Sequence, residues 1–201
     1  MEPQADTRSH ILSTGRRLTA QLGYTGVGLS TLLKEAGVPK GSFYHYFASK
    51  EDYGCALLED FVTGYQTRLD ETLSHPDMDA RSRLLTYFED WRGKQLGPNP
   101  EDRCLVVKLS AEVADLSTGM SSILKAGVSD IIARLALTLE QGAVDGSIPA
   151  AIDPEATAEK IYYLWLGASL VASLSHSAAP LDSAMKATKA LISPSEGEWE
   201  P

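Results

Sequence analysis

The sequence predicts an all-α fold of about nine helices, and three observations support this prediction. Apolar residues recur at the three- and four-residue spacings of amphipathic helices along nearly the whole chain of 201 residues. No stretch alternates apolar and polar residues as a strand with one buried face does. Glycine, proline and helix-capping residues divide the chain into segments of helical length without internal repeats.

The first quarter of the chain is expected to hold three short helices. Gly23 is expected to end the first and Gly37 the second, because glycine readily adopts the left-handed conformation at a helix C-terminus. Pro39 precedes the third helix, over residues 40–47, where its fixed φ suits the first turn. The apolar positions of the three buried faces are Ile11, Gly15, Leu18 and Leu22 in the first, Leu29, Leu32, Leu33 and Ala36 in the second, and Phe43 and Phe47 in the third.

Six longer helices are expected after residue 48. Ser49 as N-cap and Asp52 three residues later form a variant of the capping box, which opens a helix that ends before a break at residues 74–79. A loop at 97–102 and a turn at 146–154 separate later helices, and Asp153 is expected to be the N-cap of the helix that follows this turn. The apolar positions are Leu57, Phe61 and Leu69; Leu84, Phe88 and Trp91; Leu105, Leu109 and Val113; Ile123, Leu124, Ile131 and Leu135; residues 161–174; and Leu181, Ala184, Met185 and Ile192. The acidic segment 194–201 is expected to be a flexible tail.

The charge of the chain is unevenly distributed. Residues 1–50 carry six Lys or Arg and three Asp or Glu, a net charge of +3, whereas the remaining 151 residues carry 12 and 24, a net charge of −12. A polyanion such as DNA is therefore expected to contact only the first quarter of the chain, since the rest repels it.

The second and third helices, joined by the turn "GVPK" (residues 37–40), have the order of a helix-turn-helix, whose second helix enters the major groove of DNA. With Phe43 and Phe47 packed inward, polar side chains remain on the outer face to reach phosphates and base edges. Glycine at the helix start lets the backbone approach DNA closely, and a lysine at the start of the next helix suits a phosphate. The residues expected to contact double-stranded DNA are Ser30, Thr31, Lys40, Gly41, Ser42, Tyr44, His45, Tyr46 and Lys50.

An aromatic core with solvated lysines is the alternative explanation of this stretch, but the order of helix, glycine turn, short helix and capped long helix favours DNA binding. The segment "GLSTLLKEAGVPKGSFYHYFASKED" (residues 28–52) closely resembles the DNA-binding signature of TetR-family transcriptional regulators, although Gly28 and Pro39 stand where the family often has Ser or Thr caps. The resemblance implies an all-helical homodimer, with a DNA-binding domain over residues 1–50 and a ligand-binding and dimerisation domain over residues 51–193.

Two later segments resemble one subgroup of this family. "CLVVKLSAEVADLS" (residues 104–117) and "YLWLGASL" (residues 163–170) are similar to NemR- and AcuR-type repressors, which respond to electrophiles or acrylate. The resemblance implies that Cys104 is a redox and electrophile sensor. It also implies that Ser173 stands where such proteins can have a lysine that traps the oxidised cysteine, so a switch through a nitrogen–sulfur bond is not expected.

The residues around Cys104 leave two roles open for its thiol. Arg103, Lys108 one turn on, and a helix N-terminus with Asn99 as cap favour the reactive thiolate, whereas the acidic residues 101–102 oppose it. An inert buried thiol is the alternative.

Aromatic side chains on the later helices could line an inducer cavity, although plain core is the commoner role of such residues. The candidates for the sensor or ligand site are Cys104, Lys108, Tyr65, Trp91 and Trp165. The stretch "WLGASLVAS" (residues 165–173) carries small residues, which permit close helix packing either in a dimer bundle or within one chain.

The sequence thus predicts a cytoplasmic transcriptional repressor that binds a palindromic operator as a homodimer and is released by an electrophile or another small-molecule inducer. A reversible inducer with a structural Cys104 is the alternative, and a helical thiol enzyme is a third hypothesis that lacks an evident Cys/His arrangement. The two cysteines have neither zinc-site spacing nor the pattern of a disulfide framework, and we expect no metal or cofactor. No apolar stretch is long enough to span a bilayer or has the flanks of a signal peptide.

Overall fold

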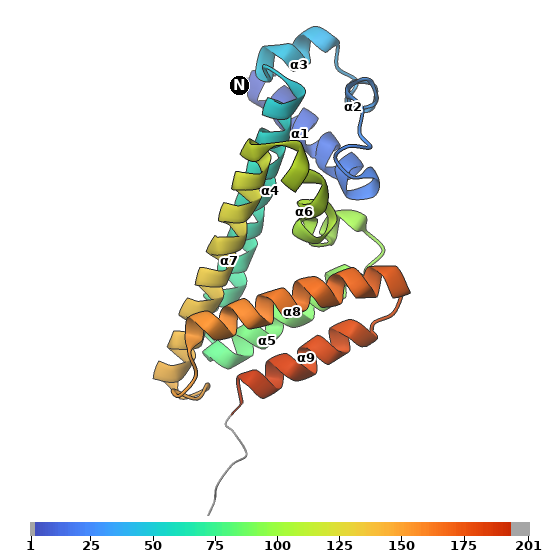
Figure 1. The fold of residues 1–201 in the computed structure, drawn as a ribbon. Coiled ribbons are helices and arrows are strands. Elements are labelled where there is room, and N and C mark those ends of the chain that lie inside the picture. The colour runs from blue at the N-terminus through green and yellow to red at the C-terminus, as the bar shows by residue number, and fades with distance from the viewer. Residues whose placement is uncertain (1–2, 194–201) are drawn as a thin grey trace, which may run out of the picture. The chain divides into compact units, whose positions relative to one another are not determined.

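The computed structural model describes residues 3–193, with side chains from Thr7 onward, and the segment 194–201 lies outside the described residues. The predicted all-α fold is confirmed: this part of the chain holds nine α-helices, one 3₁₀ helix and no strand (Figure 1). The elements are α1 (Pro3–Leu22), α2 (Leu29–Ala36), α3 (Lys40–Tyr46), α4 (Lys50–Leu73), α5 (Ala80–Leu96), η1 (Pro100–Asp102), α6 (Leu105–Leu116), α7 (Thr118–Asp145), α8 (Pro154–Ser175) and α9 (Ala179–Leu191).

The chain divides into two compact units. The first comprises residues 1–66 and 97–128, and the second comprises residues 67–96 and 129–201. The first unit therefore contains α1, α2, α3, η1 and α6, and the second contains α5, α8 and α9. Helices α4 and α7 each begin in the first unit and end in the second.

An aromatic and aliphatic core fills the first unit around the short helices. Phe43 and Phe47 are almost fully buried, and their rings lie 5.2 Å apart between centroids. Tyr53 of α4 packs against both rings. Leu22 does not belong to this core, contrary to the sequence prediction, since 54% of its surface is exposed. It is the last residue of α1, where the chain turns away from the packed face.

Local capping residues set the boundaries of the short helices. Gly37 ends α2 in the left-handed conformation at φ 64°, and its N–H donates to the carbonyl of Lys34 at 3.2 Å. The hydroxyl of Ser49 accepts the N–H of Asp52 at 2.9 Å, while the Asp52 carboxylate accepts the N–H of Ala48 at 2.8 Å. The predicted capping box therefore forms with one difference: the Asp52 carboxylate accepts the N–H of the residue before the N-cap, and not that of the N-cap Ser49 itself. These bonds fix the direction in which α4 leaves α3.

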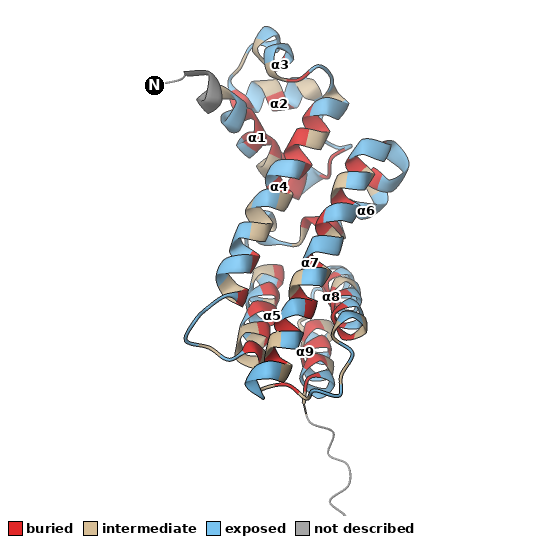
Figure 2. Ribbon diagram, turned by 90° about the vertical axis from the view of Figure 1, so that its left-hand side faces the viewer, coloured by how far each residue is buried: buried red, intermediate tan, exposed pale blue. Residues whose placement is uncertain are grey.

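Aromatic rings and small residues hold the second unit together. Trp165 stacks on Phe88 with centroids 4.8 Å apart, and its indole N–H donates to the Thr188 hydroxyl at 2.9 Å, which joins α8 to α9. Figure 2 shows the buried residues of α5, α8 and α9 on the facing sides of these helices. The small residues Ala168 and Ala172 are buried in this packing.

The described helices include none that is both long and apolar enough to cross a membrane.

Candidate functional site

Helix α3 exposes a row of polar and aromatic side chains on one face while its other face is buried. Lys40, Tyr44 and His45 are exposed, and Ser42 and Tyr46 are half-buried. The apolar face is held by Phe43 and the C-cap Phe47. All five outward residues of the sequence prediction thus lie on or near the surface of one short helix.

The outward side chains of α3 are partly ordered by contacts with one another. The Lys40 ammonium lies 5.8 Å from the centre of the Tyr44 ring, and the rings of His45 and Tyr46 meet edge to face at 4.8 Å. A Cβ on Gly41 would meet no atom of the described residues within 4 Å, so none of them requires glycine there. A glycine at an open helix start is consistent with close approach by another molecule.

Helix α2 contributes two further exposed residues at its first turn. Ser30 and Thr31 both face solvent, and the N-cap Gly28 makes no side-chain capping bond. The hydroxyls of these residues and the first turn of α2 are therefore accessible to an acceptor such as a phosphate.

Lys50 is the first residue of α4 and is half-buried against Tyr24. Its ammonium lies 5.1 Å from the centre of the Tyr24 ring, and the Tyr24 hydroxyl donates to the Lys50 carbonyl at 2.7 Å. Burial raises the pKa of Tyr24 to about 12, so this phenol stays protonated as a donor. Among the described residues no carboxylate lies within ion-pair distance of the Lys50 ammonium.

Helix α6 and its junction with α7 are hydrogen-bonded to the helices that precede them. The Glu112 carboxylate accepts the N–H of Thr25 at 3.0 Å and the Thr25 hydroxyl at 2.8 Å. The Ser117 hydroxyl donates to the Glu51 carboxylate at 2.6 Å. These contacts join residues that are 87 and 66 positions apart, and no local sequence pattern indicated them.

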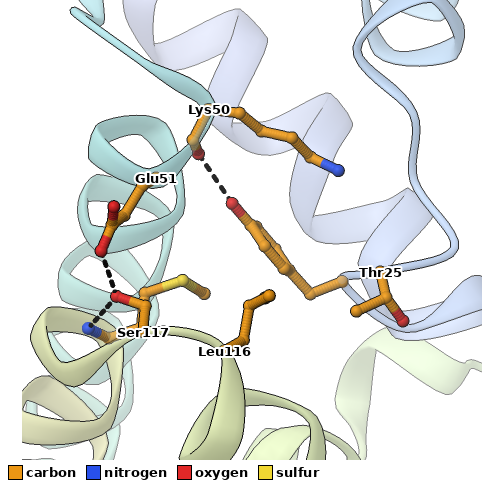
Figure 3. Close-up of a pocket in the computed structure, with 7 residues that line it drawn as sticks. Thr25, Lys50, Glu51, Leu116 and Ser117 are labelled. Carbon is orange, nitrogen blue, oxygen red and sulfur yellow. Dashed lines mark hydrogen bonds between the residues drawn. The ribbon is translucent and has the colours of Figure 1, made fainter.

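A pocket of about 320 Å³ has Thr25 on one side and Glu51 and Ser117 on the other (Figure 3). Figure 3 shows the Lys50 carbonyl bonded to the Tyr24 hydroxyl on one side and the Ser117–Glu51 bond on the other. The residues that line the pocket are Tyr24, Thr25, Lys50, Glu51, Leu116, Ser117 and Met120.

Cys104 is the N-cap residue of α6 and is half-buried. Asn99 is an N-cap residue as predicted, but of the separate 3₁₀ helix at residues 100–102 and not of α6, and its side-chain amide donates to the Asp102 carboxylate in place of a capping bond. Burial raises the pKa of the Cys104 thiol to about 11, and the nearby N–H groups of Val106 and Val107 lower it only in part. The thiol is therefore neutral at pH 7.

The two basic residues expected to activate Cys104 are directed elsewhere or solvated. Arg103 donates to the carbonyl of Gly97 at 3.2 Å, and Lys108 is exposed. Cys55, the second thiol, is half-buried in α4, and burial, followed by the charges of nearby acidic residues, raises its pKa. Neither cysteine is held as a thiolate.

The aromatic candidates are distributed over both compact units. Tyr65 lies in the first unit, half-buried beside Phe61, whereas Trp91 and Trp165 lie in the second, in contact at 5.9 Å between centroids. Both tryptophans are buried, and the Trp91 indole N–H donates to the hydroxyl of Ser169 at 2.9 Å. Their position is that of core residues with satisfied donors.

Gln95 adds a polar group to this aromatic core that the sequence prediction missed. Its amide N–H groups donate to the Ser169 carbonyl at 3.3 Å and to the Ser173 hydroxyl at 2.9 Å, while its buried carbonyl oxygen has no hydrogen-bond partner among the described residues. The available signal was its register, since Gln95 continues the apolar face of Leu84 and Trp91. A buried acceptor without a donor can receive a hydrogen bond from a ligand.

The described part of the chain contains no group of three or more His, Cys, Asp or Glu arranged to hold a metal ion.

Comparison with known proteins gives matches over most of the chain. Residues 11–52 match the family described as bacterial regulatory proteins, tetR family, and residues 80–188 match the tetracyclin repressor-like C-terminal domain. The HTH-type transcriptional repressor NemR of Escherichia coli (strain K12) is 44% identical over 187 residues, which cover 93% of this chain and 94% of NemR. The transcriptional regulator AcuR of Cereibacter sphaeroides is 31% identical over 173 residues, 86% of this chain and 79% of AcuR.

The fold agrees with that of a solved relative. The crystal structure of the reduced form of E. coli NemR has a TM-score of 0.89 to this chain at 44% identity, over 94% of this chain and 99% of that one. The matched families and relatives are regulators of transcription and not enzymes. The chain therefore belongs to the TetR family of transcriptional regulators, as a NemR-like repressor.

Proposed function

We propose that this repressor binds a near-palindromic DNA operator as a cytoplasmic homodimer, and that an electrophile or another small-molecule inducer releases it. Residues 1–50 serve as the DNA-binding domain, and residues 51–193 bind the inducer and dimerise. The observation that carries this proposal is the exposed face of α3, with Lys40, Tyr44 and His45 outward over a core of phenylalanines. A helix of this kind places its outward side chains against base edges and phosphates.

Two substitutions separate phosphate contacts from base contacts. Lys50→Ala is expected to weaken binding to all DNA sequences alike and to flatten the dependence of log K on log salt by ~1, because a phosphate contact carries no base information. His45→Ala is expected to change the preferred sequence. Operator affinity measured over a salt series checks both effects, after an operator is selected from random DNA.

Lys186→Ala is the matched control, since it removes the same charge from an exposed position on α9. It is expected to leave operator affinity and salt slope as in the wild type. A Lys50→Ala protein with wild-type affinity and slope would contradict the placement of α4 against the DNA backbone.

The inducer is proposed to act through Cys104, at the start of α6. Helix α6 also carries Glu112, which holds the turn between α1 and α2, so added bulk at Cys104 strains an element bonded to the DNA-binding domain. N-ethylmaleimide is expected to lower operator affinity of the wild type and of Cys55→Ser but not of Cys104→Ser. Because Ser173 cannot form a nitrogen–sulfur bond, hypochlorite is expected to act more weakly than an alkylating agent.

A reversible inducer is the second candidate, and two observations favour it. The Cys104 thiol is neutral at pH 7, and the buried Gln95 carbonyl oxygen offers a hydrogen-bond acceptor within an aromatic core. An inducer that does not alkylate thiols would distinguish the two candidates. If it releases the operator from Cys104→Ser at the same concentration as from the wild type, reversible binding is favoured over covalent sensing.

A further inference from the structure

We propose that the pocket beside Lys50 binds a small organic acid with an apolar body, and that the bound acid competes with the DNA backbone for the Lys50 ammonium. This inference rests on the proposed function, in which Lys50 contacts a DNA phosphate. It assigns a second ligand site, separate from Cys104 and from the aromatic core of the second unit.

The walls of the pocket are apolar and well fixed. The Tyr24 side chain is only 4% exposed and Met120 is fully buried, whereas Leu116 is half exposed and forms an edge of the pocket. Gly54 lets Tyr24 and Met120 pack closely on α4, since a Cβ there would lie 2.6 Å from the Tyr24 hydroxyl and 2.8 Å from the Met120 sulfur. An apolar molecule that displaces water from these walls is stabilised by the hydrophobic effect.

Most polar groups around the pocket already have partners. The Thr25 hydroxyl and N–H both donate to Glu112, and the Tyr24 hydroxyl donates to the Lys50 carbonyl. The Ser117 hydroxyl donates to the carboxylate of Glu51 and accepts the N–H of Met120, so it has no hydrogen left to donate to an acid.

The Lys50 ammonium and one oxygen of the Glu51 carboxylate are the exceptions among the lining side chains. The ammonium has three N–H donors and no hydrogen bond or ion pair within the described chain, only the face of the Tyr24 ring. Figure 3 shows the Glu51 carboxylate directed toward Ser117 and the Lys50 side chain extending away from it, so the two charged groups lie on different sides of the pocket. The complement of an unpaired ammonium is an acid, because a charge-assisted hydrogen bond to a carboxylate is the strongest contact that it can make.

The size of the pocket limits the acid to a small one. A volume of about 320 Å³ is at the lower end of the roughly 300–1,000 Å³ typical of ligand pockets. A bicyclic aromatic carboxylate suits this space, with its rings on Leu116 and the accessible edge of Tyr24 and its carboxylate on the Lys50 ammonium.

Competition for one ammonium couples the acid to DNA. An ammonium held by a carboxylate cannot also neutralise a phosphate, so the bound acid is expected to lower operator affinity about tenfold at low salt and to flatten the salt slope by ~1. Linkage requires that operator DNA weaken binding of the acid by the same factor.

The test uses the full-length protein with 2-naphthoate as the probe and the neutral 2-naphthamide as its matched control. Calorimetric titration is expected to show wild-type binding of the acid at least tenfold tighter than binding of the amide. Leu116→Trp fills the pocket from its exposed edge, and Leu137→Trp makes the same change at an exposed leucine of α7 in the second unit. Only Leu116→Trp is expected to lose naphthoate binding while keeping wild-type operator affinity.

A second pair of variants covers the case in which Leu116→Trp fails to fold. Lys50→Met is expected to lose at least tenfold in naphthoate affinity, and Lys50→Arg to retain it, at unchanged unfolding midpoints. Three results would each overturn the inference. The first is equal affinity for acid and amide, and the second is naphthoate binding that survives Leu116→Trp and Lys50→Met. The third is naphthoate binding to the wild type without loss of its operator affinity. Failure of the wild type to bind any operator would instead refute the proposed function, while the naphthoate titrations would still decide the pocket.

Discussion

At Gly15 the first unit has room for a hydrogen atom and nothing larger. A Cβ there would lie 1.6 Å from the hydroxyl oxygen of Tyr53, a residue that is only 2% exposed. That hydroxyl is buried and has no hydrogen-bond partner in the structure. Two close-packed groups, one of them an unsatisfied polar atom, therefore meet at the contact between α1 and α4.

We expect Gly15→Ala to lower the free energy of unfolding by roughly 1–3 kcal/mol through overpacking. Tyr53→Phe is expected to be close to neutral, because the hydroxyl that it removes makes no hydrogen bond. In the double variant the alanine is expected to cost less, since the methyl group gains the space of the lost oxygen. Urea unfolding of the four proteins measures this coupling, and an alanine equally costly in both backgrounds would disprove the steric explanation.

The stability of the second unit is expected to depend on pH through Asp145. Hydrogen bonds from the Ser147 hydroxyl and from the backbone N–H groups of Ala80 and Ser147 hold the pKa of its carboxyl below the usual range. A carboxyl whose pKa is lower in the folded state stabilises the fold above its unfolded pKa of about 3.9, and this stabilisation is lost as pH falls through the folded value.

Asp145→Asn is therefore expected to lower thermal stability at pH 7 and to approach the wild type as pH falls below about 3.9 and through the lowered folded pKa of Asp145, where its carboxyl becomes neutral. Melting temperatures measured between pH 7 and pH 2.5 check this. Asp77→Asn, at an exposed position in the segment between α4 and α5, is the control and is expected to follow the wild type throughout. A difference between Asp145→Asn and wild type that is independent of pH would contradict the assigned role of the charge.

At the scale of helices, boundaries were predictable where neighbours in the sequence decide them. Gly37, Ser49 and Asp153 each act as the caps that the sequence predicted, because capping bonds form within three residues. The 3₁₀ helix at residues 100–102 was predicted as part of a loop, since three residues carry no periodicity. Helix existence and order could therefore be read from the sequence.

The contacts that assemble helices into a site could not be read in this way. The bond between Thr25 and Glu112 spans 87 residues, and single-sequence patterns hold no information on such pairs. The same reason explains why Gln95 was not connected with Ser169. The outward face of α3 was predictable because it depends only on which side of a short helix carries phenylalanine.

The turn between α1 and α2 is expected to owe its order to α6. Removing the Glu112 carboxylate leaves the N–H of Thr25 without its acceptor, so Glu112→Ala is expected to speed amide hydrogen exchange at Thr25 by at least tenfold. NMR exchange rates provide the measurement, with Glu101→Ala in η1 as the control. Unchanged protection of the Thr25 amide would show that the turn is ordered without α6.

For the molecule as a whole, we propose the exposed apolar face of α8 as the surface of the homodimer. Tyr163, Leu170 and Leu174 are each more than half exposed and share one face of this helix with Gly167. Ala168 and Ala172 are buried within the protomer, which is the second of the two roles that the sequence left open for the small residues of this helix. The stripe of small residues is thus divided between the inside of the protomer and the proposed dimer surface.

Gly167→Leu is expected to weaken the proposed homodimer by roughly 1–3 kcal/mol through overpacking while sparing the protomer, because a Cβ at Gly167 meets no atom within 4 Å in residues 3–193. Gly93→Leu is the matched control, since Gly93 is also helical, exposed and without atoms near its Cβ position. Sedimentation equilibrium over a concentration series measures the dimer dissociation constant. Equal constants for the two variants would place the dimer surface elsewhere.

The neutral thiol of Cys104 also sets a timescale. With its pKa raised from 9.0 to about 11, about one molecule in ten thousand carries the thiolate at pH 7, compared with about one in a hundred for an unshifted thiol. The greater nucleophilicity of the more basic sulfur recovers about tenfold, which leaves alkylation roughly tenfold slower. In the proposed function, a slow and irreversible reaction makes the fraction of inactivated repressor follow concentration multiplied by time. At a given concentration of electrophile, a brief exposure therefore inactivates little of the repressor, whereas a prolonged exposure inactivates most of it.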